Sequence, residues 1–310
     1  MLTVLQTALE VGLIYGLVAL ALFISFSILN IADLSTDGCF TFGCAVGAML
    51  TIAGHPILAL FAAMAAGMLS GYVTAFLQTR LGVESILAGI ISNTGLYTIN
   101  LAVMGFSSNV SITGVDTVFS LFKGLVGGQW SRLILLALIA AVVVIVLIRF
   151  FGTSLGLSIR ATGDSLDMVS ASSINPKATI TIGLCLANAL TALSGCLIGE
   201  YNKFCDINLG TGMVTIALAS LIIGEVFAGH RGGVGKRIVC VVLGSIVYRF
   251  IIALALRLNI SAEYFKLVSA VIVAVAIAAP NMKGYIRLAK IKSNARKLRA
   301  LSGKGDKTDA

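Results

Sequence analysis

Long apolar runs dominate this sequence and constrain its fold more than any other feature. They follow one another from residue 7 to residue 280, each about twenty residues long, which is enough for a helix to cross a hydrocarbon core of about 30 Å. Lipid offers no hydrogen-bond partner to an open backbone, so such runs form helices. The sequence therefore predicts an all-α protein that crosses a membrane many times.

The number of spans follows from counting these runs. We expect about eight to ten transmembrane helices. The runs cover residues 7–29, 38–54, 56–79, 86–104, 131–150, 178–199, 212–228, 235–257 and 264–280. The first run has no basic segment before it and no cleavage site after it, so we interpret it as a retained span. A re-entrant segment over residues 30–54 would change the count by one.

The charged residues are few and unevenly placed. Only 11% of the residues are charged, compared with roughly a quarter in soluble domains. Nine of the 22 Lys and Arg residues lie between Lys283 and Lys307. Basic segments beside a membrane bind anionic lipid and mark the cytoplasmic side, so the net charge of +9 does not indicate nucleic acid binding. We expect a transmembrane domain over residues 1–282 and a basic cytoplasmic tail over 283–310.

The same charges predict an orientation. With the tail inside and the spans alternating, 16 of the 22 basic residues fall on the cytoplasmic side, in agreement with the positive-inside rule. The polar loop 105–130 and the N-terminus then lie outside.

Cysteine, histidine and glycine indicate packing rather than chemistry. The six cysteines are scattered and form no CxxC pair, and His55 and His230 are isolated, so we expect no disulfide framework and no metal site. Glycines four residues apart let helix backbones approach closely in lipid. For any single pair we favour packing within the chain over a dimer seam. The pairs are Gly12 and Gly16, Gly43 and Gly47, Gly67 and Gly71, and Gly195 and Gly199.

A polar segment, residues 30–38, interrupts the first two apolar runs. Charges beside a span are costly unless they face water or protein. One interpretation is that Asp33, Ser35 or Thr36 caps a helix that starts near Gly38. The other is a broken helix beside a solute pathway. The pathway candidates are Asp33, Ser35, Thr36, Asp37 and Asn93. Asn93 and Asn188 have a second possible role as hydrogen-bond links between helices.

The polar loop 152–177 separates two long spans on the predicted inner side. Residues 161–173 fit a short helix that Thr162 or Asp164 caps, and Pro176 starts the next element. Leu166, Met168 and Val169 give this helix an apolar edge, which favours docking into a groove of a partner. The alternative is an amphipathic loop on the membrane surface.

Two further features are interpreted structurally. The glycine-rich segment 229–237 does not match a phosphate loop, because His230 and Arg237 stand where glycine and Ser or Thr are required. We therefore expect a tight turn there and no ATP site. Glu225 and Arg249 are charges within apolar runs, and we expect them to pair with each other or to reach an interface.

Two segments resemble a known family. Residues 29–43, LNIADLSTDGCFTFG, and residues 156–175, GLSIRATGDSLDMVSASSIN, are similar to segments in the permease subunits of branched-chain amino acid and ribose type ABC importers. The resemblance covers nearly the whole chain. It implies a bacterial plasma membrane protein with no cofactor of its own, a separate ATPase that binds ATP and magnesium, and a solute-binding protein outside. It also implies a coupling helix that contacts the ATPase. Its residues would be Arg160, Gly163, Asp164, Leu166, Asp167, Met168 and Ser172.

The variant ADLSTDG, residues 32–38, looks closest to a branch of this family encoded with a single permease. Some members of that branch are linked to aromatic amino acids. The resemblance therefore implies a homodimer that transports tryptophan or tyrosine. The alternatives are an ion-coupled secondary transporter, which should show intramembrane carboxylates and two comparable halves, and an assembly protein without transport activity. We find few such carboxylates and no convincing internal repeat.

Overall fold

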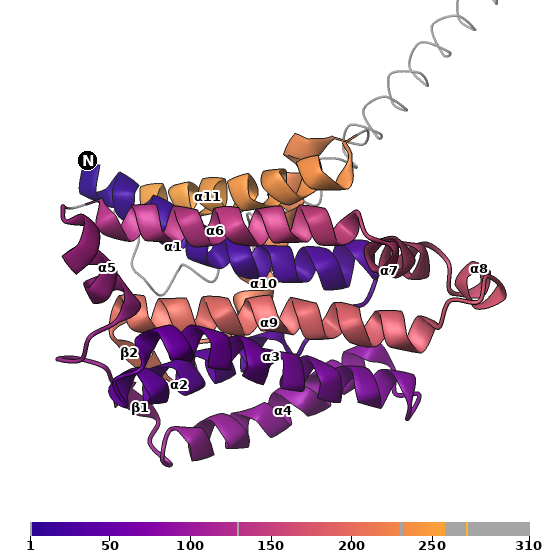
Figure 1. Ribbon diagram of the computed structural model, residues 1–310, viewed down its shortest axis with the longest axis horizontal. Coiled ribbons are helices and arrows are strands. Elements are labelled where there is room, and N and C mark those ends of the chain that lie inside the picture. The colour runs from indigo at the N-terminus through magenta and orange to yellow at the C-terminus, as the bar shows by residue number, and fades with distance from the viewer. Residues whose placement is uncertain (1, 129, 230–231, 258–270, 272–310) are drawn as a thin grey trace, which may run out of the picture.

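The protein is an elongated helical bundle in the computed structural model, which describes residues 2–128, 130–229, 232–257 and 271 (Figure 1). Its helices are α1 (Leu2–Leu22), the π-helix η1 (Phe23–Ile28), α2 (Thr36–Ile52), α3 (Pro56–Thr79), α4 (Ser85–Val103), α5 (Val118–Val126), α6 (Ser131–Phe151), α7 (Ser154–Asp164), α8 (Leu166–Ala171), α9 (Pro176–Asn202), α10 (Met213–Ala228) and α11 (Val234–Arg257). Two short strands, β1 (Asn109–Ser111) and β2 (Phe204–Asp206), lie at one end.

Six of these helices are long and apolar enough to cross a membrane. They are α1 continued by η1, α3, α4, α6, α9 and α11. The other two apolar helices, α2 and α10, are shorter, with 17 and 16 residues. Together these eight helices correspond to the first eight predicted runs. The ninth run, 264–280, and the basic tail lie outside the described residues. The prediction of an all-α membrane protein is confirmed.

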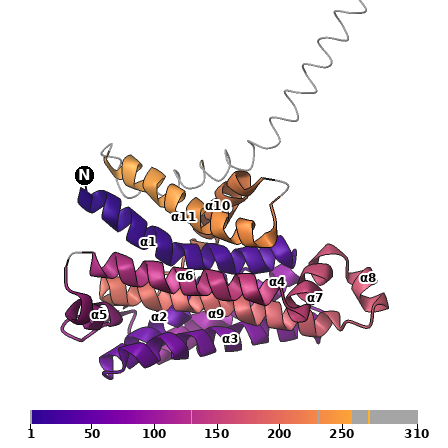
Figure 2. The same ribbon diagram turned by 45° about the horizontal axis from the view of Figure 1, so that its top comes forward.

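Helix α9 lies at the centre of the bundle and packs against α1, α2 and α3 (Figure 2). Small residues make this packing close. A Cβ atom on Gly71 would meet the backbone of Leu184, and one on Gly195 would meet the backbone of Phe40. The pair Gly12 and Gly16 faces α11 in the same way. The predicted glycine pairs thus all pack within the chain.

The same order of secondary-structure elements occurs twice in the chain. A long helix, a non-helical segment and a short apolar helix follow one another in α1–η1, 29–35 and α2, and again in α9, 203–212 and α10. The contacts are paired as well, because α1 packs on α10 and α11 while α9 packs on α2 and α3. Helices α1 and α9 run in opposite directions (Figure 1). This arrangement is that of an inverted repeat, which the sequence analysis did not detect.

The strands mark one end of the bundle, which we call the strand end. β1 pairs antiparallel with β2, with Val110 opposite Cys205. Thr117 caps α5 there, because its hydroxyl accepts the Ser120 N–H while the Ser120 hydroxyl accepts the Thr117 N–H. The opposite end carries α7 and α8, and we call it the coupling end (Figure 1). The predicted loop 105–130 therefore contains a strand and a helix that sequence reasoning missed.

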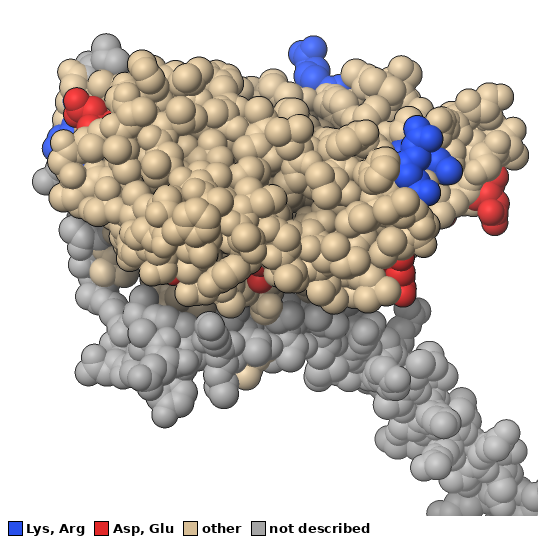
Figure 3. Space-filling view, turned by 90° about the horizontal axis from the view of Figure 1, so that it is seen from below, with Lys and Arg blue, Asp and Glu red and all other residues tan. Residues whose placement is uncertain are grey.

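Between these ends the surface is apolar. On the face shown in Figure 3, the charged side chains lie mainly along the edges, and uncharged residues fill the middle. Large apolar side chains are exposed along α3, α4 and α6, including Phe61, Leu69, Ile91 and Ile145. This surface fits contact with lipid.

Candidate translocation pathway and coupling segment

The predicted helix break lies between η1 and α2. The chain turns at Asn30, whose φ is +56°, and helix α2 begins at Thr36 rather than near Gly38. Ser35 is the residue before the helix, and it makes no side-chain capping hydrogen bond. The prediction of a broken helix is therefore supported by the geometry, and the prediction of an ordinary capped helix start is wrong.

Asp33 links the non-helical segment between η1 and α2 to the central helix α9. One carboxylate oxygen accepts hydrogen bonds from the Ser35 N–H at 2.9 Å and the Ser35 hydroxyl at 2.6 Å. The other accepts from the Asn188 amide of α9 at 2.8 Å. Asp33, Ser35 and Thr36 are all buried, so these three predicted pathway residues hold the backbone in place beneath the surface. The predicted link between helices through Asn188 is present.

Asp37 joins the two short helices. Its carboxylate oxygens accept the backbone N–H groups of Gly212 and Val214, both at 2.9 Å, at the start of α10. The Thr41 hydroxyl accepts the Gly210 N–H at 3.0 Å. The first N–H groups of a helix have no partner within it, and a carboxylate there is favourable because the helix dipole is positive at that end. An α2 side chain thus caps α10.

A pocket of about 320 Å³ opens beside this junction, between α2, α4 and the segment that leads into α10. We call it the α2–α4 pocket. Its lining is Asp37, Gly38, Thr41, Asn93, Thr94, Tyr97, Asn100, Ile207, Asn208 and Thr211. Two of the five predicted pathway residues, Asp37 and Asn93, therefore meet in one pocket.

The remaining polar lining was missed by sequence reasoning, although part of it had a signal. Asn93, Tyr97 and Asn100 recur at intervals of four and three residues, which places them on one face of α4. Asn100 is 1% exposed, and its amide donates to the Gly38 carbonyl at 3.1 Å. Its side-chain oxygen has no hydrogen-bond partner among the described residues. Asn208 and Thr211 reach the pocket only through the tertiary fold.

The predicted coupling helix is two helices. The expected single helix over residues 161–173 is wrong, because the extended backbone of Ser165 separates α7 from α8. The cap of α8 is also Ser165, whose hydroxyl accepts the Met168 N–H. Thr162 instead bonds to Ser158 and Thr179. The prediction that Pro176 starts the next element is confirmed, with Asn175 as its cap.

The predicted coupling residues divide into two groups. Exposed residues, at the end of α7 and on α8, are Asp164, Leu166, Asp167, Met168 and Ser172. Arg160 and Gly163 are partly buried, and a Cβ on Gly163 would overlap the carbonyl of Ile28. Helix α7 therefore packs directly against the start of the break between η1 and α2.

The charges within the apolar runs pair differently from our expectation. Glu225 of α10 forms an ion pair with Arg237 of α11, and both bond to the Ser27 hydroxyl of η1. The expected pair of Glu225 with Arg249 is wrong. The guanidinium of Arg249 lies 3.7 Å from the centre of the Tyr15 ring, as a cation–π contact.

Comparison with known proteins assigns the chain to a family. Residues 4–277 match the family described as branched-chain amino acid transport system / permease component. The chain belongs to this permease family. It is 32% identical over 272 residues to a tyrosine transport system permease protein of Clostridioides difficile (strain R20291), which covers 87% of this chain and 89% of that protein. It is 30% identical over 277 residues to an uncharacterised protein of Rickettsia prowazekii (strain Madrid E), covering 88% and 96%. No solved structure matches the chain.

Membership of this permease family settles the general role. The chain is a multi-pass membrane subunit of an ABC-type amino acid transport system, and its role is transport without catalysis. Permeases of this family carry no cofactor, and they work with a separate ATPase and a solute-binding protein. Two comparable halves were our mark of a secondary transporter, but the repeated elements seen here occur in a permease of the ABC type.

Proposed function

We propose that this permease imports an aromatic amino acid, with tyrosine as the first candidate, and that the α2–α4 pocket lies on the solute pathway. The similarity to a tyrosine transport permease supports the choice of solute. The pocket has the required chemistry, because an amino acid brings charged groups and a ring. Asp37, Asn93 and Asn208 offer polar atoms, and Tyr97 offers an aromatic face.

The unpartnered oxygen of Asn100 is the observation that carries this proposal. A buried acceptor without a donor costs roughly 1–3 kcal/mol, and this one belongs to a residue that lines the pocket. A solute ammonium or hydroxyl group would supply the missing donor once the pocket opens onto this buried oxygen. Asn100 is also part of the polar face of α4, which is expensive inside a bilayer unless it meets water or protein.

A second copy of the chain would cover this polar face. Helix α4 exposes Thr94, Tyr97 and Thr98. Only 28% of the most apolar stretch of this helix is buried within the chain. We infer a homodimer in which the two α4 helices face each other and the two pockets border a common pathway. The Thr94 hydroxyl donates to the Ile90 carbonyl within its own helix. Lipid would, however, offer no hydrogen-bond partner to the hydroxyl of Tyr97 or the amide of Asn93.

The coupling end faces the cytoplasm in this proposal. Arg80, Arg149, Arg160 and Lys177 gather there, as the positive-inside rule requires. The ATPase binds the exposed edge of α8, which includes Leu166 and Met168, with 53% and 71% exposure. A movement of α8 would displace α7, which contacts Ile28 at Gly163. The ATP-bound state then favours one orientation of the pathway.

Uptake in proteoliposomes tests the function. Vesicles that contain the permease and its ATPase, with the binding protein outside, should accumulate labelled tyrosine only when ATP is enclosed. Tyr97→Ala should reduce uptake about tenfold or more through lost aromatic contact, whereas Ile99→Ala, an exposed residue of the same helix outside the pocket, should not. Uptake without ATP, or equal loss in both variants, would contradict the proposal.

A further inference from the structure

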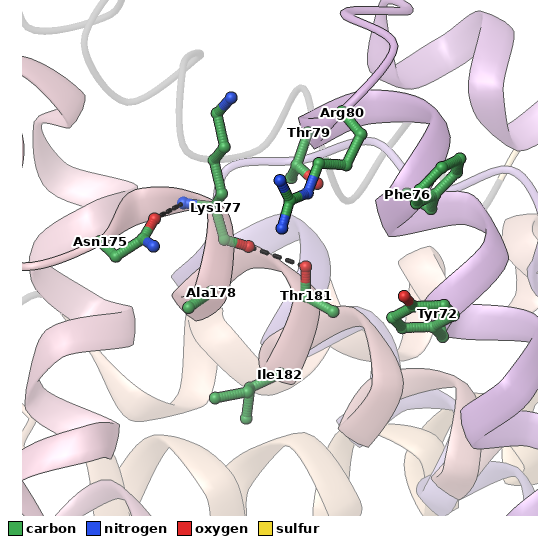
Figure 4. Close-up of a pocket in the computed structure, with 9 residues that line it drawn as sticks. All are labelled: Tyr72, Phe76, Thr79, Arg80, Asn175, Lys177, Ala178, Thr181 and Ile182. Atoms are coloured by element: carbon green, nitrogen blue, oxygen red, sulfur yellow. Dashed lines mark hydrogen bonds between the residues drawn. The ribbon is translucent and has the colours of Figure 1, made fainter.

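A second pocket lies at the coupling end, between the last turns of α3 and the first turns of α9, with a volume of about 310 Å³. We call it the α3–α9 pocket (Figure 4). Its lining is Tyr72, Phe76, Thr79, Arg80, Asn175, Lys177, Ala178, Thr181 and Ile182. None of these residues belongs to the α2–α4 pocket or to the exposed edge of α8. We propose that this pocket binds the headgroup of an anionic phospholipid.

The charges of the pocket favour an anion. Arg80 and Lys177 line it, and no carboxylate does. Neither residue forms a salt bridge with a described residue. The salt bridge found among the described residues joins Arg237 and Glu225. Figure 4 shows the Arg80 guanidinium reaching from α3 toward Thr181 of α9, whereas the Lys177 side chain extends from the first turn of α9 in the opposite direction. Two cations from different helices, neither in a salt bridge with a described residue, therefore border one space.

The other polar atoms leave donors available. The Asn175 side-chain oxygen is occupied by the Lys177 N–H at 3.0 Å, which leaves its NH₂ group for a ligand. The hydroxyls of Thr79 and Thr181 donate to the carbonyls of Ala75 and Lys177 within their own helices. A guanidinium, an ammonium and an amide NH₂ are all donors, and a phosphate is a strong acceptor.

The apolar part of the pocket selects a lipid over a soluble anion. Tyr72, Phe76 and Ile182 are 52%, 43% and 37% exposed, and they lie farther along their helices from the basic end. Tyr72 and Arg80 are eight residues apart in sequence, which corresponds to roughly 12 Å along a helix. A charged headgroup beside Arg80 thus places its acyl chains along Tyr72 and Phe76. Basic pockets between helices at the cytoplasmic side recognise anionic headgroups in this way.

A lipid in this pocket would act on the coupling segment. Asn175 caps α9 directly after the loop from α8, and Lys177 is in the first turn of α9. The headgroup would hold this turn against the end of α3. The position of α8, and with it the docking of the ATPase, would then depend on anionic lipid. This consequence rests on the proposed function, whereas lipid binding itself does not.

Native mass spectrometry of the purified full chain tests the binding. We expect phosphatidylglycerol to bind about tenfold more tightly than phosphatidylcholine. The double variant Arg80→Gln and Lys177→Gln should lose this preference. The control variant Arg149→Gln and Lys236→Gln removes two exposed cations outside this pocket and leaves the basic tail intact, so it should retain the preference.

Three outcomes would overturn the proposal. Unchanged phosphatidylglycerol binding by the Arg80 and Lys177 variant would place the lipid elsewhere. Equal loss in the control variant would indicate a general charge effect. Displacement of the lipid by millimolar inorganic phosphate would mean that a soluble anion occupies the pocket. Tyr72→Ala with Phe76→Ala should weaken binding of long-chain lipid and leave short-chain lipid less affected, which supports the assigned orientation. None of these measurements depends on transport activity.

Discussion

Polar residues that are close in sequence have different structural roles in this permease. Asp33 and Asp37 are one helical turn apart, and both were candidates for the pathway. The buried Asp33 carboxylate accepts hydrogen bonds from Ser35 and Asn188. The Asp37 carboxylate accepts the first N–H groups of α10 beside the α2–α4 pocket. The partners supplied by distant segments, rather than the residue type, separate these roles.

Asp33→Ala should destabilise the fold. The substitution removes the acceptor for the buried Asn188 amide and for two Ser35 donors, and a buried donor without a partner costs roughly 1–3 kcal/mol. We expect a lower unfolding temperature of the purified protein in detergent, measured by the fluorescence of a thiol-reactive dye. Asp116→Ala, a change of the same kind in the exposed loop at the strand end, is the matched control. Equal unfolding temperatures for both variants would mean that Asp33 does not hold the break.

Helices α7 and α8 show how one predicted element became two. The apolar edge and the polar flanks of residues 161–173 indicated a helix, but the Ser165 hydroxyl bonds forward to the Met168 N–H and starts a new one. Serine competes with helical hydrogen bonding in this way and favours caps. Helix α7 is then free to pack on the break, and α8 to remain exposed at the coupling end (Figure 1).

This division predicts two distinct defects. The triple variant Asp164→Ala, Asp167→Ala and Met168→Ala should fail to retain the ATPase on purification, because the exposed contact edge is lost. Gly163→Leu should retain it but show ATP hydrolysis that no longer responds to the loaded binding protein, because a side chain there displaces α7 from Ile28. Co-purification and ATPase assays separate the two. Identical behaviour of both variants would contradict the assignment of contact to α8 and transmission to α7.

At the scale of the whole molecule, helices α4 and α6 expose different surfaces. The polar face of α4 and the α2–α4 pocket lie on the surface, whereas α6 exposes apolar side chains such as Val142 and Ile145. The inferred homodimer explains this contrast, since it places α4 at a protein contact and α6 against lipid.

Cross-linking in membranes checks the dimer. In a background with the six cysteines replaced by alanine, Thr94→Cys should give a covalent dimer with a short bifunctional maleimide. Val142→Cys, at an exposed position on α6, should give no covalent dimer under the same conditions. A dimer formed only through Val142 would place the partner on the opposite face and remove the basis for a pathway between the α4 helices.

The sequence by itself determined the class of fold, the position of the eight apolar helices within the described residues, and the family. Apolar runs of membrane length force helices because lipid cannot bond to the backbone, and this requirement needs no knowledge of neighbours. The sequence also located the break at residues 30–38 and the polar loop at 152–177, because charged and hydroxyl groups there have no place in lipid.

Only the tertiary structure decided which polar groups meet. Three features join segments far apart in sequence: the cap of α10 by Asp37, the hydrogen bond of Ser27 with Glu225 and the entry of Asn208 into the α2–α4 pocket. The relation between α1–α2 and α9–α10 also appears only in space, because a repeat of element order leaves no repeat of residues. Hydrogen bonds and ion pairs act over a few ångströms, so their partners depend on the packing of helices around α9, and no local pattern carries that information.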